Sequence, residues 1–283
     1  MISDLVFFGF WKAQLTIFFL RNKVGNMSKT DWRNLLTDKL NDKQKSAVKS
    51  IEGETLVIAG AGSGKTAVLT RRCAYLICLG VVPGSILSLT FTNKAAAEMN
   101  KRIKEILAEI GVNLPIIPPW KEDYLSNPLF CTFHSLGVRI LREFGQSLGY
   151  KKEFTILDKE DHLKLIRSIM KEMNLDQKQI LPSLVSHFIG LCKQELLTAE
   201  NSSLLSKEFL PIFHGIYAKY EDRLRKNQSV DFDDLVILPY LILRDNETAR
   251  NICQNRWRHV QIDEFQDTNK AQFAMVKLLY PPN

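Results

Sequence analysis

A short glycine-rich run that ends in lysine and threonine has the spacing of a phosphate-binding loop. It consists of Ala59, Gly60, Ala61, Gly62, Ser63, Gly64, Lys65 and Thr66. It departs from the G-x-x-x-x-G-K-S/T pattern only at Ala59. Glycines let backbone N–H groups turn toward a phosphate chain, and the N-terminus of the following helix adds partial positive charge. We expect Lys65 to reach the β- and γ-phosphates and Thr66 to bind Mg²⁺. A chance glycine-rich turn is the alternative, but the loop follows an apolar run and opens a helical one.

Two adjacent carboxylates, Asp263 and Glu264, follow a second apolar segment at residues 260–262. At the end of a parallel strand they would lie at the same sheet edge as the phosphate loop. We expect Asp263 to hold Mg²⁺ through water, and Glu264 to orient and deprotonate the attacking water. By itself such a pair is often a helix cap, so the phosphate loop is what makes nucleotide hydrolysis the expected chemistry.

Gln44 lies upstream of the loop, at the end of a Leu-Asn-Asp-Lys-Gln segment. Its side-chain amide offers both donors and an acceptor, which suits the edge of an adenine base. By residue type alone it is an ordinary surface glutamine.

Aromatic and polar residues end two further apolar segments. The first set is Phe91, Thr92, Asn93 and Lys94, and the second is Thr132, Phe133 and His134. An aromatic ring at such a position is able to stack on a base while the polar side chains reach phosphates. Residue type alone favours a core phenylalanine, a helix cap and a structural histidine. The acidic residues 231–234 are interpreted as a helix start, where carboxylates are favoured, rather than as a metal site.

The elements that position these residues alternate between strand and helix in the first part of the chain. Apolar runs at 55–59 and 86–91 predict buried strands. Helical patterns cover residues 43–51, 65–79 and 93–110, with Asn41 and Asp42 as a cap signal for the first and Asn93 for the third. Residues 111–128 contain four prolines and predict a loop. This order predicts an α/β fold with a parallel sheet.

The pattern turns helical after a short strand near residues 130–132, and a strand at 259–263 and a helix at about 268–280 follow. Apolar stripes, for example Leu136, Ile140 and Leu141, predict core-facing helices, and Asp158 is expected to cap one of them. The interruption predicts an α/β domain over residues 27–132 and 257–283, with a helical domain inserted at 133–256.

The first 26 residues differ from the rest. Residues 5–20 are mostly apolar but contain Lys12 and Gln14, so they are too short and too interrupted for a membrane span. They also lack the order of features in a secretory signal. We expect Met27 to be the true start and residues 1–26 to be an upstream extension, with a surface-anchoring segment as the alternative.

The net charge and the cysteine pattern bear on the expected partner and cellular location of the protein. The net charge of +7 fits a nucleic-acid partner without requiring one. The five cysteines form no C-x-x-C pair and no histidine stands at ligand spacing beside a pair, which argues against a zinc site or a disulfide framework. A cytoplasmic location without a membrane partner is therefore expected.

Together, these segments resemble the UvrD/Rep/PcrA helicases of superfamily 1 over about residues 36–280. Residues 40–44 look like the family's Q motif, 59–66 like motif I, 90–99 like motif Ia, 132–134 like motif Ib, and 262–269 like motif II. Residues 230–235 are similar to a motif of the family's inserted domain.

The resemblance implies a fold and an activity. The fold is the first RecA-like lobe, a P-loop NTPase domain with an inserted all-helical domain. The activity is ATP hydrolysis with Mg²⁺, coupled to 3′-to-5′ translocation on single-stranded or 3′-tailed DNA in repair or replication. By this resemblance Gln44 becomes an adenine contact and Phe91 a base-stacking residue.

The sequence departs from the family pattern in two ways. Ala67 stands where many members have arginine. Asn283 is the last residue, just where the family continues into motif III and later motifs, including arginines that a second RecA-like lobe points at the γ-phosphate. Such arginines raise the rate by orders of magnitude. We therefore expect unwinding to require a second lobe, in a longer chain or a partner chain.

Three alternatives are weighed. The motor part of an AddA/RecB-like helicase-nuclease is disfavoured by the Thr-Asn-Lys-Ala form of residues 92–95 and by Asn269. A second alternative is a nucleotide- and DNA-binding remnant without turnover. A P-loop kinase or metabolic enzyme is the third, and the later motifs leave it little room.

Overall fold

The chain folds as two compact units in the computed structural model, which describes residues 2–9, 29–60, 62–114, 126–205 and 211–280. Unit 1 comprises Met1–Thr132 and Asn251–Asp267, together with the last two residues. Unit 2 comprises Phe133–Arg250 and Thr268–Pro281. The division after Thr132 falls where the sequence pattern places the start of the helical block. Residues 268–281, expected in the α/β domain, belong instead to unit 2.

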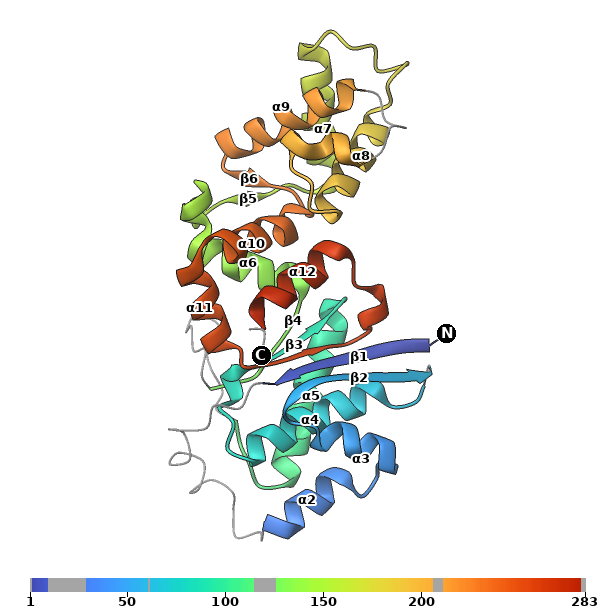
Figure 1. Ribbon diagram of the computed structural model, residues 1–283, viewed down its shortest axis with the longest axis vertical. Helices are drawn as coiled ribbons and strands as arrows, with labels where there is room; N and C mark the ends of the chain where they lie inside the picture. Colours follow the sequence, from blue (N-terminus) through green and yellow to red (C-terminus); the bar gives the residue numbers. More distant parts are fainter. Residues whose placement is uncertain (1, 10–28, 61, 115–125, 206–210, 281–283) are drawn as a thin grey trace. The chain divides into compact units, whose positions relative to one another are not determined.

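Unit 1 is built on a five-stranded sheet with the order β2-β1-β7-β3-β4 (Figure 1). The strands are β1 (Ile2–Gly9), β2 (Gly53–Gly60), β3 (Ile86–Thr90), β4 (Leu129–Thr132) and β7 (His259–Ile262). Strand β3 pairs in parallel with both β4 and β7, as expected for strand-helix repeats. Strand β1 pairs antiparallel with β2 and with β7. The part of the N-terminal segment that the structure describes is therefore a strand of the sheet, and its ladder with β2 runs from Ile2↔Gly60 to Gly9↔Gly53.

The helices of unit 1 are α2 (Lys29–Thr37), α3 (Asp42–Lys49), α4 (Lys65–Cys78) and α5 (Asn93–Glu109), with short 3₁₀ turns at Pro83–Ser85 and Phe265–Asp267. Helices α3, α4 and α5 lie on the same side of the sheet (Figure 1). Their core includes Leu69, Cys73, Leu76, Ile103 and Leu107. The helices follow from the sequence pattern, because apolar side chains recur at helical spacing and face this core.

Strand β2 corrects one expectation. The apolar run at 55–59 predicts a fully buried strand, but the side chains alternate between half-buried and exposed. Val57 packs against the core, whereas Leu56 is 53% exposed and Ile58 is 63% exposed. Periodicity alone does not distinguish one covered face from two, because both cases allow apolar residues at every position. Strand β3 is buried at every position, as expected.

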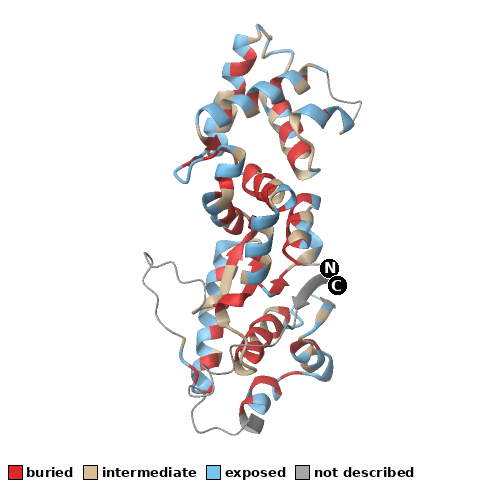
Figure 2. Cartoon of the chain, turned by 60° about the vertical axis from the view of Figure 1, so that its left-hand side comes forward, coloured by how far each residue is buried: buried red, intermediate tan, exposed pale blue. Residues whose placement is uncertain are grey.

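Unit 2 is mainly helical. Its helices are α6 (Phe133–Phe144), α7 (Lys159–Glu172), α8 (Pro182–Gln194), α9 (Ile212–Lys226), α10 (Asp234–Asp245) and α12 (Lys270–Leu279), with 3₁₀ turns at Gly145–Leu148 and Ala199–Leu204. Helix α11 (Glu247–Arg256) runs across the sequence boundary between the units. The expectation of an all-helical block is wrong in one detail, since β5 (Thr155–Ile156) pairs in parallel with β6 (Ser229–Val230). The core of α7, α8 and α9 includes Ile166, Met170, Phe188, Ile189 and Tyr217. Figure 2 shows buried and exposed residues along these helices.

Side-chain hydrogen bonds cap the first turn of several helices. Asn41 and Gln44 form a capping box at α3, and the Asp158 carboxylate accepts from two backbone N–H groups at the start of α7. The cap of α5 is Thr92 rather than the expected Asn93, because the Thr92 hydroxyl accepts from the Ala95 N–H. Among the described residues no helix is long and apolar enough to cross a membrane. All five cysteines lie among the described residues, and none of them forms a disulfide.

Candidate nucleotide site and an exposed aromatic pair

The turn between β2 and α4 has the backbone that a phosphate-binding loop needs. Gly62 and Gly64 have φ values of 74° and 85°, in the left-handed region that glycine adopts without strain. Gly64 is the N-cap of α4, so the first N–H groups of that helix have no earlier helical carbonyl to bond. The Ser63 N–H donates to the Gly60 carbonyl and tightens the turn. Ala61 lies outside the described residues.

Lys65 is the first residue of α4 and is 8% exposed. Its ammonium donates to the carbonyls of Gly60 (3.1 Å) and Ala59 (3.4 Å), within its own loop. Backbone carbonyls are neutral, so this charge has no full counter-charge among these contacts. An anion in the loop would supply one, which fits the expected role toward the β- and γ-phosphates. Thr66 follows Lys65 in the first turn of α4.

Gln44 is tied to the phosphate loop. Its side-chain carbonyl accepts from the Asn41 N–H (2.9 Å), and its side-chain NH₂ donates to the Ser63 carbonyl (2.8 Å). A Cβ at Gly64 would lie 3.1 Å from the same NH₂ group. The amide therefore links the cap of α3 to the loop. This leaves one N–H and one carbonyl lone pair for the expected adenine contact.

Asp263 and Glu264 follow β7, as expected. The Asp263 N–H donates to the Leu89 carbonyl (2.9 Å), which extends the ladder with β3 by one residue. A buried side-chain bond from Gln261 to Ser88 (3.0 Å) holds the same register. Burial, together with the neighbouring Glu264 charge, raises the pKa of Asp263 to about 6, although the Lys65 charge opposes that shift.

Glu264 has a φ of 51°, in the left-handed region that non-glycine residues seldom adopt. Such a backbone costs on the order of 1 kcal/mol and tends to occur where function requires it. A 3₁₀ turn follows at once, closed by a bond from the Asp267 N–H to the Glu264 carbonyl (2.9 Å). The Glu264 carboxylate accepts from the Gln266 side chain (2.9 Å), so the backbone and a neighbour both fix its direction.

The side chains at this sheet edge fit a metal–nucleotide complex better than a metal held by protein alone. Among the described residues no three His, Cys, Asp or Glu side chains come together as a metal site. Mg²⁺ is typically held by one or two carboxylates plus waters and substrate phosphates. One buried carboxylate with a raised pKa, Asp263, and a hydroxyl, Thr66, are a donor set of that kind.

The residues expected to bind DNA are placed differently from one another. Phe91 is half-buried, Thr92 caps α5 with its side chain, and Asn93 and Lys94 are exposed. Thr132 is 6% exposed and Phe133 only 1% exposed, so these two side chains belong to the core and do not offer a contact surface. His134 is half-buried, and burial lowers its pKa, which favours the neutral ring.

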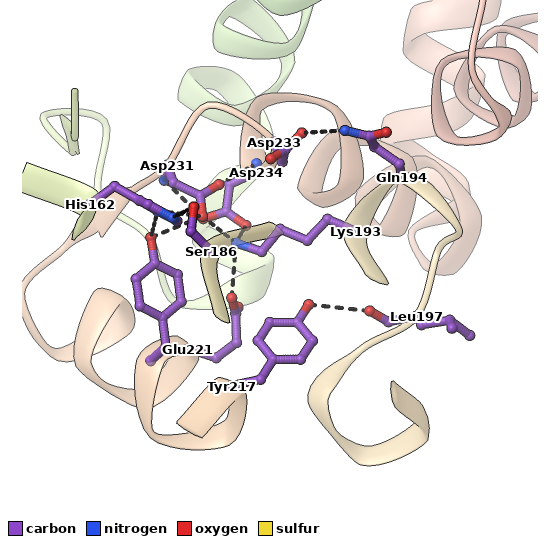
Figure 3. A network of polar contacts seen from close by, with 11 residues as sticks. His162, Ser186, Lys193, Gln194, Leu197, Tyr217, Glu221, Asp231, Asp233 and Asp234 are labelled. Atoms are coloured by element: carbon purple, nitrogen blue, oxygen red, sulfur yellow. Dashed lines mark hydrogen bonds and ion pairs between the residues drawn. The ribbon is translucent and has the colours of Figure 1, made fainter. Parts of the chain in front are cut away.

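Two features of unit 2 were missed by the sequence reasoning. The ring of Phe232, 59% exposed, stacks on His134 with centroids 3.8 Å apart and an interplanar angle of 24°. Residues 231–234 do start a helix, as interpreted, but their carboxylates also bind a fully buried lysine, Lys193 (Figure 3). The sequence shows only that Phe232 stands between acidic residues. This pattern does not indicate that Phe232 stacks on His134 or that the acids bind Lys193.

The sheet is mixed, with β3, β4 and β7 in parallel and β1 antiparallel to both β2 and β7. A left-handed glycine turn between a strand and a helix, with acids at the end of another strand of the same sheet, is typical of α/β P-loop proteins. The family model described as "UvrD/REP helicase N-terminal domain" matches residues 40–283. This chain belongs to the UvrD/REP helicase family. Strand β1 lies outside the matched residues.

Curated relatives agree with the family match. The ATP-dependent DNA helicase PcrA of Bacillus subtilis (strain 168) is 40% identical over 248 residues, which make up 87% of this chain and 32% of the relative. The protein of the same name from Staphylococcus epidermidis (strain ATCC 35984) is 38% identical with the same coverage. The one from Leuconostoc citreum is 38% identical over 246 residues, 86% of this chain and 31% of its own length. The chain thus spans about a third of the length of these relatives.

Proposed function

We propose that this chain is the ATP-binding first lobe of an ATP-dependent DNA helicase that moves 3′ to 5′ on single-stranded DNA, in repair or replication. The observation that carries the proposal is the sheet edge of unit 1, where Lys65 donates to carbonyls of the phosphate loop and its charge acts on Asp263, the first residue after β7. The relatives named as ATP-dependent DNA helicases support the choice of activity.

In this proposal each residue of the edge has a role. Lys65 and the loop N–H groups bind the phosphates, and Thr66 and Asp263 hold Mg²⁺. Glu264 orients and deprotonates the attacking water. Gln44 contacts adenine and couples that contact to the loop through its bond to Ser63. Full turnover requires a second RecA-like lobe that supplies arginines to the γ-phosphate.

Unit 2 is proposed to be a domain inserted in the RecA-like lobe, since its main stretch, Phe133–Arg250, is flanked in sequence by the unit 1 stretches Met1–Thr132 and Asn251–Asp267. Each unit offers a DNA contact of its own. In unit 1 these are Phe91 with the exposed Asn93 and Lys94. In unit 2 it is the Phe232–His134 stack, because an exposed flat aromatic ring suits an unpaired base.

Nucleotide binding tests the first part of the proposal. The chain is titrated with a fluorescent ATP analogue, with and without Mg²⁺. Mg²⁺-dependent binding is expected, Lys65→Ala should abolish it, and Glu264→Gln should preserve it. Tight binding by Lys65→Ala would refute the assignment of the loop.

DNA binding tests the second part. Fluorescence anisotropy with an oligothymidylate should detect binding, and Phe91→Ala should weaken it by about 1–3 kcal/mol if the ring stacks on a base. An unchanged DNA affinity would mean that Phe91 packs within unit 1 and does not contact a base. ATP hydrolysis stimulated by DNA would exclude the remnant without turnover.

A further inference from the structure

Residues 231–234 form a closed turn at the start of α10. The Asp231 N–H donates to Asp234 Oδ2 (2.9 Å), and the Asp234 N–H donates to Asp231 Oδ1 (2.8 Å). Each carboxylate therefore holds the backbone of the other residue. Phe232, between them, has its side chain turned out to solvent.

The second oxygen of each carboxylate binds one lysine. Lys193 Nζ lies 2.7 Å from Asp231 Oδ2 and 2.6 Å from Asp234 Oδ1, and 2.9 Å from Glu221 Oε1 (Figure 3). We call these four residues the Lys193 network. The side chains of Lys193, Asp231 and Asp234 are 1%, 5% and 0% exposed. Burial favours the neutral amine, but the three acids outweigh it and raise the pKa of Lys193 well above its usual value.

A neutral relay extends the network to α7 and α8. The Tyr220 hydroxyl donates to Asp231 Oδ2 (3.0 Å), His162 Nδ1 lies 2.6 Å from that hydroxyl, and His162 Nε2 lies 2.8 Å from Ser186 Oγ. Burial lowers the pKa of His162, so a neutral ring that donates from Nδ1 and accepts at Nε2 satisfies every bond. The turn is thus held from α7, α8 and α9.

Helix α6 brings His134 to the same turn. Gly137 packs so closely against α10 that a Cβ there would overlap the Leu235 carbonyl. His134 lies three residues before Gly137, on the same face of α6. The approach of the two backbones sets the His134 ring against Phe232.

Burial of an ion network does not by itself argue for a role in stability. A buried ion network is weak evidence for stabilisation, because apolar side chains of similar size often serve as well. An exposed phenylalanine also gains little from burial. The network instead fixes the backbone of the turn at residues 231–234, because both aspartates are held by Lys193 and by each other.

We propose that the Lys193 network is a positioning device that holds the Phe232–His134 stack as a preformed surface for an unpaired DNA base. This inference rests on the DNA-binding role proposed above for Phe232. Lys193 itself is a positioning residue, since it is buried and reaches the base only through Phe232.

The test combines DNA affinity with a spectroscopic readout. Phe232→Ala should weaken oligothymidylate binding about 5- to 150-fold, the range for one stacked base. Lys193→Met should weaken it by no more than that, and the double variant should bind like Phe232→Ala. The chain has five histidines, so NMR should identify the His134 ring protons by the shift that Phe232→Ala removes, and Lys193→Met should move the same signals.

Two further variants complete the design. Lys164→Met, which removes an exposed lysine of α7 and the same charge, should change affinity less than about twofold. If Lys193→Met fails to fold, Asp234→Asn replaces it in the same measurements, because it keeps the side-chain size and loses one bond of the network.

The outcomes separate the two proposals. Loss of affinity in Phe232→Ala, with wild-type affinity and unmoved His134 signals in a folded network variant, would overturn the positioning role alone. An unchanged affinity in Phe232→Ala would overturn the DNA role of Phe232 and this inference with it.

Discussion

Both units bury a lysine beside carboxylates, but they treat its charge in opposite ways. In unit 1, the Lys65 ammonium donates to two backbone carbonyls, and the pKa of Asp263 is raised to about 6. In unit 2, Lys193 meets three carboxylates within 2.9 Å. In the proposed nucleotide site, an anion would supply a counter-charge that the hydrogen-bond partners of Lys65 lack. In the Lys193 network, the protein's own carboxylates supply it. The two regions therefore differ in whether a ligand would help to balance a buried lysine.

Matched lysine replacements should show the largest difference. Lys193→Met leaves buried carboxylates without their counter-charge and should lower the free energy of unfolding by about 3–5 kcal/mol. Lys65→Met should change it by less than about 1 kcal/mol while removing nucleotide binding. Urea unfolding followed by circular dichroism measures both.

Tryptophan fluorescence locates the damage, because all four tryptophans fall in the sequence ranges of unit 1. In Lys193→Met the helical signal should be lost at lower urea than the fluorescence change. Equal losses of stability for the two variants would remove the contrast between the units.

Gly137→Ala should break the approach of α6 and α10. The added methyl group meets the Leu235 carbonyl, a backbone atom that cannot rotate away, so a loss of about 1–3 kcal/mol is expected. The control is Gly215→Ala in α9, where the nearest atom is Met173 Cε at 3.7 Å. The control should be neutral or more stable by up to about 1 kcal/mol, since alanine favours helix. Equal effects would show that the close approach is not required.

Mild acid should destabilise unit 1 through His259. Burial, helped by the Arg72 and Arg258 charges, lowers the pKa of His259 to about 4, below the unfolded value of 6.5. Between these two values the unfolded chain binds more protons, so stability is present above pH 6.5 and is lost as the pH falls toward 4. His259 alone should lose about 2 kcal/mol of stabilisation between pH 7.5 and 5. Asp263 offsets part of this loss, because its pKa is raised to about 6 and its protonation in the same range favours the folded state.

The measurement is the urea midpoint of the tryptophan signal at several pH values. His259→Gln has no ring to titrate, so wild type should lose stability relative to this variant as the pH falls from 7.5 to 5. A stability difference between the two that does not change with pH would contradict the low pKa of His259.

The smallest expected effect is at Glu264. Glu264→Gly relieves the left-handed backbone and should raise the stability of unit 1 by up to about 1 kcal/mol. Glu264→Gln keeps the strained backbone and should leave stability nearly unchanged. Thermal unfolding of wild type and of both variants measures these differences in stability. A loss of stability in Glu264→Gly would mean that the carboxylate contributes more than its backbone costs.

The local structure around the proposed nucleotide site was predictable from sequence, because turns and helix starts depend on neighbouring residues. The glycine turn, Lys65 at the start of a helix and Asp263 at the end of a strand each depend on a few consecutive residues. The family and the parallel pairing of β3 with β4 and β7 were also predictable. The burial of individual side chains was not predictable. Phe133, for example, was expected to contact DNA but lies in the core.

What only the tertiary structure decided is which distant groups meet. Strand β1, in a segment for which the sequence predicted no strand, pairs with both β2 and β7, which are distant from it along the chain. The exposed face of β2 depends on which helices cover the sheet. Lys193 binds Asp231 and Asp234, which lie 38 and 41 residues further along the chain. The sequence alone determined turns, caps and the order of the motifs, since these rest on neighbours. The pairing of buried charges depends on how whole helices pack, and that is a property of the folded chain.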